Sequence, residues 1–154
     1  MKLTSIAYFG ILIFLFTGCS KDDKILNDLE KGNWVAATDD TNPSSNPPGE
    51  FGINGTNQYH AWQTCRLDDT FSFSKNRLII NDNGTACEND YDLIFEIKDQ
   101  PYSYDADKKQ LTIGSGNNVA VMDVLELDNE RLKLGIAVPS GTGFKRIIFL
   151  FKRN

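Results

Sequence analysis

The residues of this chain that could carry out chemistry are few: three cysteines, one histidine and scattered aromatic and acidic side chains. His60 is the one candidate for a general base near neutral pH, and no serine or cysteine nucleophile stands in a recognisable motif beside it. One histidine and three cysteines also leave little material for a zinc site. We therefore predict a protein that is not an enzyme and that uses no metal ion and no cofactor.

Composition limits the partners that we expect. The 154 residues include 16 basic and 21 acidic side chains, which gives a formal charge of -5. A protein that binds nucleic acid through its phosphates normally carries a basic face, so we expect no nucleic-acid partner. A hydrophobic content of 40% and this length are typical of one globular domain, which we expect to be a monomer.

The amino terminus has the organisation of a secretory signal. Lys2 is followed by an uncharged run, Ile6 to Phe16, that is shorter than the roughly 20 apolar residues of a membrane-spanning helix. The stretch from Leu15 to Cys19 then resembles the lipobox of bacterial lipoproteins. This resemblance implies that residues 1–18 are a signal peptide and that lipid is attached to Cys19. The alternative is an ordinary signal peptide with an incidental cysteine.

Residues 19–24 continue from this cysteine as an acidic tether, with Asp22 and Asp23 between two lysines. An acidic run at this place resembles the surface-export signal of lipoproteins in the Bacteroidota; the alternative is a solvated spacer. We therefore expect a protein of the outer membrane, anchored through the lipid on Cys19 and exposed at the cell surface.

Cys65 and Cys87 remain as a pair in an oxidising compartment. A two-residue turn at Lys75-Asn76 pairs residues whose numbers sum to 151, which places Phe73 opposite Leu78. The two cysteines sum to 152, so a small bulge would bring them together. We predict a structural disulfide; a redox-active pair is the alternative, but a Cys-x-x-Cys pattern is absent.

The domain at residues 25–154 is read as a short helix at Ile25 to Lys31 followed by strands. Alternating apolar residues and Asn, Asp and Gly turns predict about eight strands of an all-β protein. The predicted strands are Trp34 to Ala37, Thr70 to Ser74, Arg77 to Asn81, Tyr91 to Lys98, Tyr102 to Tyr104, Gln110 to Ile113, Val119 to Leu127, Arg131 to Val138 and Phe144 to Phe151.

The long hairpin between Val119 and Val138 has an ambiguous register. A turn at Asn129-Glu130 places Leu125 opposite Leu134, but it also places Asp123 on the apolar face. Either Asp123 lies at a wet cavity or the register slips so that Ala120, Met122 and Val124 face inward.

A long Pro-rich connection, Thr38 to Tyr59, is typical of a functional or mobile loop. It leads into aromatic residues that could stack on a sugar or line a pocket mouth. The candidate ligand-binding residues are Tyr59, His60, Trp62 and Trp34. The alternatives are that both tryptophans plug the barrel and that His60 is exposed to solvent.

Gly32-Asn33-Trp34, the lipidated start, the short helix and the run from Cys65 to Phe71 together resemble the lipocalin-like lipoproteins of Bacteroidota. The turn at Asn83-Gly84-Thr85 before Cys87 adds to this resemblance. It implies an antiparallel up-and-down β-barrel or curled sheet, with room for an interior pocket.

Three functions follow as hypotheses. The first is non-catalytic binding of a small apolar or amphipathic ligand, which predicts a cavity lined by Phe71, Phe73, Leu125 and Leu134 and would be excluded by a filled interior. The second is glycan binding, which needs exposed, coplanar aromatic rings around Trp62. The third is a structural subunit of an envelope complex, which predicts an exposed apolar patch.

Overall fold

The computed structural model describes residues 21–84, 87, 94–95, 97–141 and 143–154. These residues form a short helix, two 3₁₀ turns and nine strands. The elements are α1 (Lys21–Glu30), β1 (Asn33–Ala36), η1 (Pro43–Ser45), β2 (Asn57–Tyr59), η2 (Thr64–Arg66), β3 (Thr70–Ser74), β4 (Arg77–Asn81), β5 (Asp99–Asp105), β6 (Gln110–Ser115), β7 (Asn118–Leu127), β8 (Arg131–Ser140) and β9 (Gly143–Arg153).

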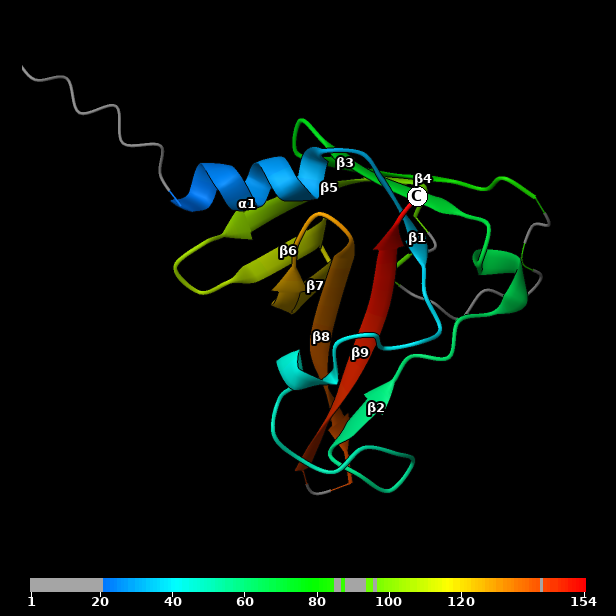
Figure 1. The fold of residues 1–154 in the computed structure, drawn as a ribbon, viewed down its shortest axis with the longest axis vertical. Coiled ribbons are helices and arrows are strands. Elements are labelled where there is room, and N and C mark those ends of the chain that lie inside the picture. Colours follow the sequence, from blue (N-terminus) through cyan, green and yellow to red (C-terminus); the bar gives the residue numbers. More distant parts are fainter. Residues whose placement is uncertain (1–20, 85–86, 88–93, 96, 142) are drawn as a thin grey trace, which may run out of the picture.

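Eight of these strands form a closed antiparallel barrel. Strands β3 to β9 follow one another as an up-and-down meander, and β1 closes the barrel by pairing with both β3 and β9 (Figure 1). The register of the closing pair places Trp34 opposite Arg153. The prediction of an all-β, up-and-down barrel with a short N-terminal helix is confirmed.

The ninth strand, β2, lies in the segment that the sequence suggested was a loop. It pairs in parallel with the first half of β9, from Asn57 opposite Arg146 to Tyr59 opposite Ile148. The segment between β1 and β3 thus crosses the outside of the barrel and extends the sheet beyond it. In Figure 1 it runs over β8 and β9 before it reaches β2.

The helix and one predicted strand differ from expectation. α1 begins at Lys21 instead of Ile25, so part of the predicted acidic tether is helical. Residues 21–24 contain no glycine or proline that would break a helix, so the helix can start before Ile25. Of the predicted strand at Tyr91 to Lys98, residues 91–93 and 96 lie outside the described residues, and Ile94 and Phe95 form a turn.

The hairpin of β3 and β4 has the predicted register. Phe71 lies opposite Ile80 and Phe73 opposite Leu78. Lys75 and Asn76 both have positive φ, as a two-residue hairpin turn requires. The predicted bridge between Cys65 and Cys87 is also confirmed, with the Cα atoms 5.5 Å apart.

The register of the β7–β8 hairpin differs from the simple prediction. Leu127 lies opposite Leu132 as expected, but a bulge between Val124 and Glu126 shifts the pairing, so Val124 and not Leu125 lies opposite Leu134. The bulge leaves Asp123 opposite Gly135 and turns buried Ala120 and Met122 towards the core. The prediction that Leu125 faces Leu134 is wrong, and the slipped register applies.

Candidate functional site

One end of the barrel is closed by side chains from distant parts of the chain. The Arg153 guanidinium lies over the Trp34 ring, 3.8 Å from its centroid, and donates a hydrogen bond to the carbonyl of Asp28 in α1. Trp34 donates its indole N–H to the carbonyl of Leu29 at 3.0 Å. Cation–π stacking and these bonds attach α1 to the barrel at the end where the β7–β8 turn lies.

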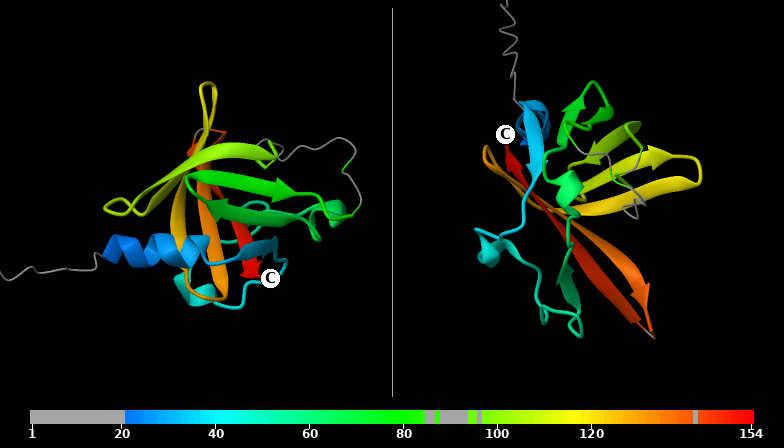
Figure 2. Two further views of the ribbon diagram at one scale, coloured as in Figure 1. Left: turned by 90° about the horizontal axis from the view of Figure 1, so that it is seen from above. Right: turned by 90° about the vertical axis from the view of Figure 1, so that its right-hand side faces the viewer.

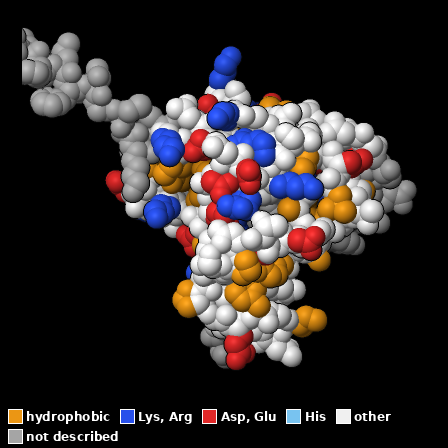
Figure 3. All heavy atoms as spheres, viewed as in Figure 1, with side chains coloured by type: hydrophobic (Ala, Val, Ile, Leu, Met, Phe, Trp, Pro, Cys, Tyr) orange, Lys and Arg blue, Asp and Glu red, His pale blue; other side chains and the backbone are white. Residues whose placement is uncertain are grey.

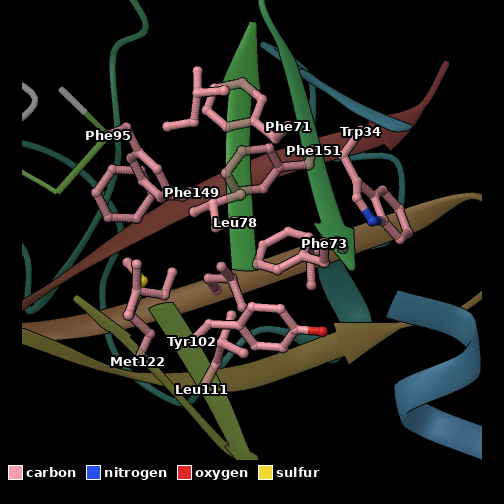
Figure 4. Packing of buried hydrophobic residues seen from close by; sticks show 14 of the residues in the cluster. Trp34, Phe71, Phe73, Leu78, Phe95, Tyr102, Leu111, Met122, Phe149 and Phe151 are labelled. Carbon is pink, nitrogen blue, oxygen red and sulfur yellow. The ribbon is translucent and has the colours of Figure 1, made fainter. Parts of the chain in front are cut away.

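The interior above this closed end is filled with aromatic rings. Trp62, Phe71, Phe95, Phe149 and Phe151 pack at centroid distances of 5.2 to 5.8 Å, mostly edge to face. Figure 4 shows the labelled phenylalanines pointing into this shared space from β3, β9 and the turn before β5.

The predicted interior cavity is therefore absent at its predicted place. Phe71, Phe73 and Leu134 are fully buried in the core cluster. Leu125 lies beside Gly135 at the bulge: a Cβ atom added to Gly135 would lie 3.0 Å from Cδ1 of Leu125. Neither of the two pockets described below is lined by any of these four residues. The prediction of a cavity between them is wrong, because aromatic side chains fill the space.

The candidate ligand-binding residues Trp34, Trp62 and His60 pack within the protein and do not form an exposed surface. Trp34 is completely buried, and Trp62 is only 9% exposed and donates its indole N–H to the carbonyl of Leu150. His60 packs between the rings of Trp62 and Phe149, at 4.7 and 4.5 Å, so the expectation of a solvent-exposed histidine is wrong. An exposed, coplanar platform around Trp62 does not exist, because burial in the core stabilises its large apolar ring.

The opposite end of the barrel contains an open, mainly apolar pocket of about 450 Å³. This volume lies within the range of small-molecule sites. The pocket lies between the start of β7, the far half of β8 and the segment that leads into β5. Its lining residues are Ile94, Ile97, Gln100, Ile113, Asn117, Asn118, Val119, Ala120, Ile136 and Val138. We call it the mouth pocket.

The mouth pocket exists because two neighbouring strands separate. β7 and β8 are paired only from Asp123 to Leu127. In the right-hand view of Figure 2 they leave their common turn side by side and then diverge, β7 with β6 and β8 with β9. The mouth pocket lies between the two hairpins, at the end of the barrel away from α1.

A second group of residues attaches the crossing segment, residues 38–59, to the outside of β8. We call this segment the strap. The Lys133 ammonium, only 2% exposed, lies 2.9 Å from both carboxylate oxygens of Asp40 and also contacts Ser45 and Asn46 at 2.8 Å. Tyr59, a predicted ligand residue, donates its hydroxyl to Asp40 at 2.7 Å. Its polar group is therefore used in fixing the strap.

A buried carboxylate on β7 completes this arrangement. Glu126 accepts hydrogen bonds from Asn42 and Ser45 of the strap, each at 2.8 Å, and from Arg131 at 2.7 Å. Burial raises the pKa of Glu126, but these three bonds outweigh it, so the net pKa lies below the ordinary value. Burial likewise raises the pKa of Asp40, and bonds from Tyr59 and Lys133 bring it below the ordinary value. Both carboxylates are therefore ionised near neutral pH.

A hollow of about 330 Å³ lies beside the strap, between Thr38 to Thr41 and the outer faces of β8 and β9. Its buried charges, Asp40, Glu126 and Lys133, already pair with one another. A ligand would have to compete with these bonds, so we regard the hollow as part of the strap attachment. The mouth pocket, which is apolar and open, is the better candidate site.

Sequence reasoning missed both Lys133 and the mouth pocket. A lysine between Leu132 and Leu134 is what an outward strand position normally holds, and only the strap above it makes the position buried. Nothing in the sequence marked Asn117 and Val119 as pocket residues, because turn and edge residues of these types are common.

Within the described ranges, no three His, Cys, Asp or Glu side chains gather as metal ligands, and no helix is long and apolar enough to cross a bilayer.

Comparison with known proteins adds no relative. No protein-family model, no curated protein and no solved structure matches the chain. The class that the geometry defines is an eight-stranded antiparallel barrel with one closed end, a filled interior and an apolar pocket at the open end.

Proposed function

We propose that this protein is a lipid-anchored, non-catalytic binding protein that takes a small apolar or amphipathic ligand in the mouth pocket, and not in the filled interior where the sequence placed the ligand. The observation that carries the proposal is the mouth pocket, in which Ile97, Ile136 and Val138 leave apolar surface in contact with solvent. Apolar side chains lining a concave site favour an apolar ligand, since its binding removes this surface from water.

The anchoring part of the proposal is supported by the sequence before α1. Cys19 follows the signal-like segment and precedes the start of α1 at Lys21 by two residues. Because Arg153 bonds α1 at the closed end of the barrel, a lipid on Cys19 would place that end near the membrane. The mouth would then point away from the bilayer, as suits a lipoprotein that meets its ligand outside. We further propose the outer membrane and the cell surface as its location.

Native mass spectrometry of the full-length chain, extracted from its own cell envelope, tests the ligand. We expect a small mass that co-purifies with the protein. Val138→Trp, which fills the mouth pocket, should remove this mass, whereas Thr112→Trp on the outer face of β6 should retain it. Bare protein, or a mass that both variants keep, would reject binding at the mouth.

A second candidate, a subunit of an envelope complex, is favoured by one apolar tip. Ile53 and Phe144 are 81% and 72% exposed and line one shallow pocket at the end of the β8–β9 hairpin. In Figure 3 one cluster of hydrophobic side chains lies on the lower part of the face, and most charged side chains lie on the upper part, among further hydrophobic ones. Cross-linking in intact envelopes, lost in an Ile53→Ser, Phe144→Ser double variant, would support this function; unchanged products would reject it.

A further inference from the structure

The mouth pocket runs along a seam where the barrel wall is not hydrogen-bonded. Pairing of β6 with β7 extends to Ser115 opposite Asn118, but pairing of β7 with β8 stops at Asp123 opposite Gly135. Residues 118–122 of β7 therefore pair with β6 alone, and residues 136–140 of β8 pair with β9 alone. Among the described residues, no strand fills the space between these two edges.

The direction of the backbone groups of β7 follows from one hydrogen bond. The N–H of Val124 donates to the carbonyl of Lys109 at 2.8 Å, on the β6 side. In an antiparallel pair, residues bond to one neighbour and then the other in alternation, so the even-numbered residues of β7 bond to β6. Val119 and Val121 therefore direct their N–H and C=O groups towards the seam.

The same argument applies to β8. The carbonyl of Glu130 accepts from the N–H of Arg153 at 2.8 Å, which assigns the even-numbered positions to β9. Ala137 then directs its N–H and C=O towards the seam, and Pro139 directs its C=O there. Because proline has no N–H, Pro139 shortens the usable edge on β8, and the longer edge is that of β7.

Side chains along the seam are apolar on both faces of the sheet. Ala120, Ile136 and Val138 line the mouth pocket inside the barrel. Val119 and Val121 are about half exposed on the β7 edge. Successive side chains of an extended segment point to opposite faces, so one set would enter the pocket and the other would cover the two valines.

The opposite edge of the β8–β9 hairpin already binds an extended segment. β2 adds to the free edge of β9 through backbone bonds, with Arg146 donating to Thr56 and His60 donating to Ile148 at 2.8 Å each. A lipid tail could fill the pocket, but it has no groups that pair with the N–H and C=O of Val119 and Val121. A peptide meets both requirements: an apolar side chain fills the pocket, and the backbone pairs with these N–H and C=O groups.

We propose that the mouth takes an extended peptide segment of another protein, which adds as a strand to β7 at Val119 and Val121 and inserts an apolar side chain into the pocket. This inference rests on the proposed function because both place a ligand in the mouth pocket, but the ligand here is a segment of a protein and not a free small molecule. Main-chain hydrogen bonds supply affinity, and the pocket selects the apolar side chain.

The probe is a blocked synthetic heptapeptide of alternating valine and threonine, added to the full-length chain in lipid nanodiscs with empty nanodiscs as the blank. Two further versions carry N-methyl groups on every second residue, one on each edge of the peptide. We expect the parent peptide to bind and to slow hydrogen exchange at the amides of Val119, Val121 and Ala137. At least one N-methylated version should bind about tenfold more weakly, since two or more hydrogen bonds are lost.

A backbone variant makes the test independent of the peptide chemistry. Val119→Pro removes an N–H that points to the seam without removing a bond to β6, and Val119→Ala is its matched control. We expect weaker peptide binding by the first variant than by the second, with exchange protection of the β6–β7 ladder unchanged in both.

Other outcomes overturn the inference in distinguishable ways. Equal binding of parent and N-methylated peptides, or no peptide binding while a small apolar mass still co-purifies, overturns strand addition and leaves the proposed function standing. Absence of both signals overturns both. Concentration-dependent protection of Val119 and Val121 without any peptide would assign the seam to a second copy of the chain and also overturn the inference.

Discussion

The ammonium of Lys133 lies 2.9 Å from both carboxylate oxygens of Asp40, a residue 93 positions earlier in the chain. This pair holds the strap on the outer face of the barrel. Both side chains are less than a tenth exposed to solvent. The last residues of the strap form β2, which pairs with β9. Asp40 and Lys133 therefore fix the path of the strap across β8.

Replacing Lys133 with methionine should destabilise the protein strongly. Asp40 and Glu126 would remain buried without this cation, and removal of one partner of a buried pair costs about 3 to 5 kcal/mol. Urea unfolding followed by tryptophan fluorescence measures the change. Lys152→Met, an exposed position on β9, is the control and should change stability little. A loss below about 1 kcal/mol for Lys133→Met would show that the pair contributes no more than a surface ion pair.

Acid should weaken the attachment of the strap. Hydrogen bonds lower the pKa of Asp40 and Glu126 in the folded protein below 3.8 and 4.5, the values of the free side chains. A lowered carboxyl pKa stabilises the fold above the unfolded-state value, and this contribution is lost as the pH falls through the folded-state value. Unfolding free energy should thus decrease from about pH 5 downward.

Asp69 has the opposite effect on the pH dependence of stability. Burial raises the pKa of its carboxyl despite the bond from Arg66, so its protonation favours the folded protein as the pH falls. The double variant Asp40→Asn, Glu126→Gln separates the two effects. Its stability should depend less on pH between about 3 and 5 than that of the wild type. An identical pH profile would contradict the assignment to the strap.

Because of the bulged register, neighbouring residues of β7 differ sharply in burial and therefore in the stability lost when each is replaced. Met122 is fully buried, so Met122→Ala should cost about 2 to 5 kcal/mol. Asp123 points away from the core and accepts one 3.2 Å bond from Gln110, so Asp123→Ala should change stability by about 0.5 kcal/mol or less. Thermal unfolding of both variants decides the register, and a reversed order of costs would restore the unbulged pairing.

Loss of the disulfide should destabilise the barrel. The bridge links residues 22 positions apart, and closing a loop of this length is worth about 3 kcal/mol in the chain-entropy model. The double variant Cys65→Ser, Cys87→Ser should unfold at a correspondingly lower urea concentration. Wild-type protein treated with reductant serves as the comparison. Agreement between the two would assign the loss to the bridge, whereas an unchanged midpoint in both would show that the bridge adds no stability.

Local patterns in the sequence were sufficient for much of the barrel. Alternating Phe71 and Phe73, a two-residue turn and a second apolar run predict the β3–β4 hairpin with its register, because every contact involved lies within a few residues. The position of the two cysteines relative to that register likewise predicts their bridge. Cys19 and the segment before it determine the expectation of a lipid anchor.

Only the tertiary structure decided the contacts that join distant segments. Lys133 became buried because the strap crosses it, and Trp62 entered the core because β9 and the turn at Phe95 surround it. The mouth pocket opened because the pairing of β7 with β8 stops at Asp123 opposite Gly135. Strand periodicity specifies which side chains share a face, but it carries no information about which segment will cover that face.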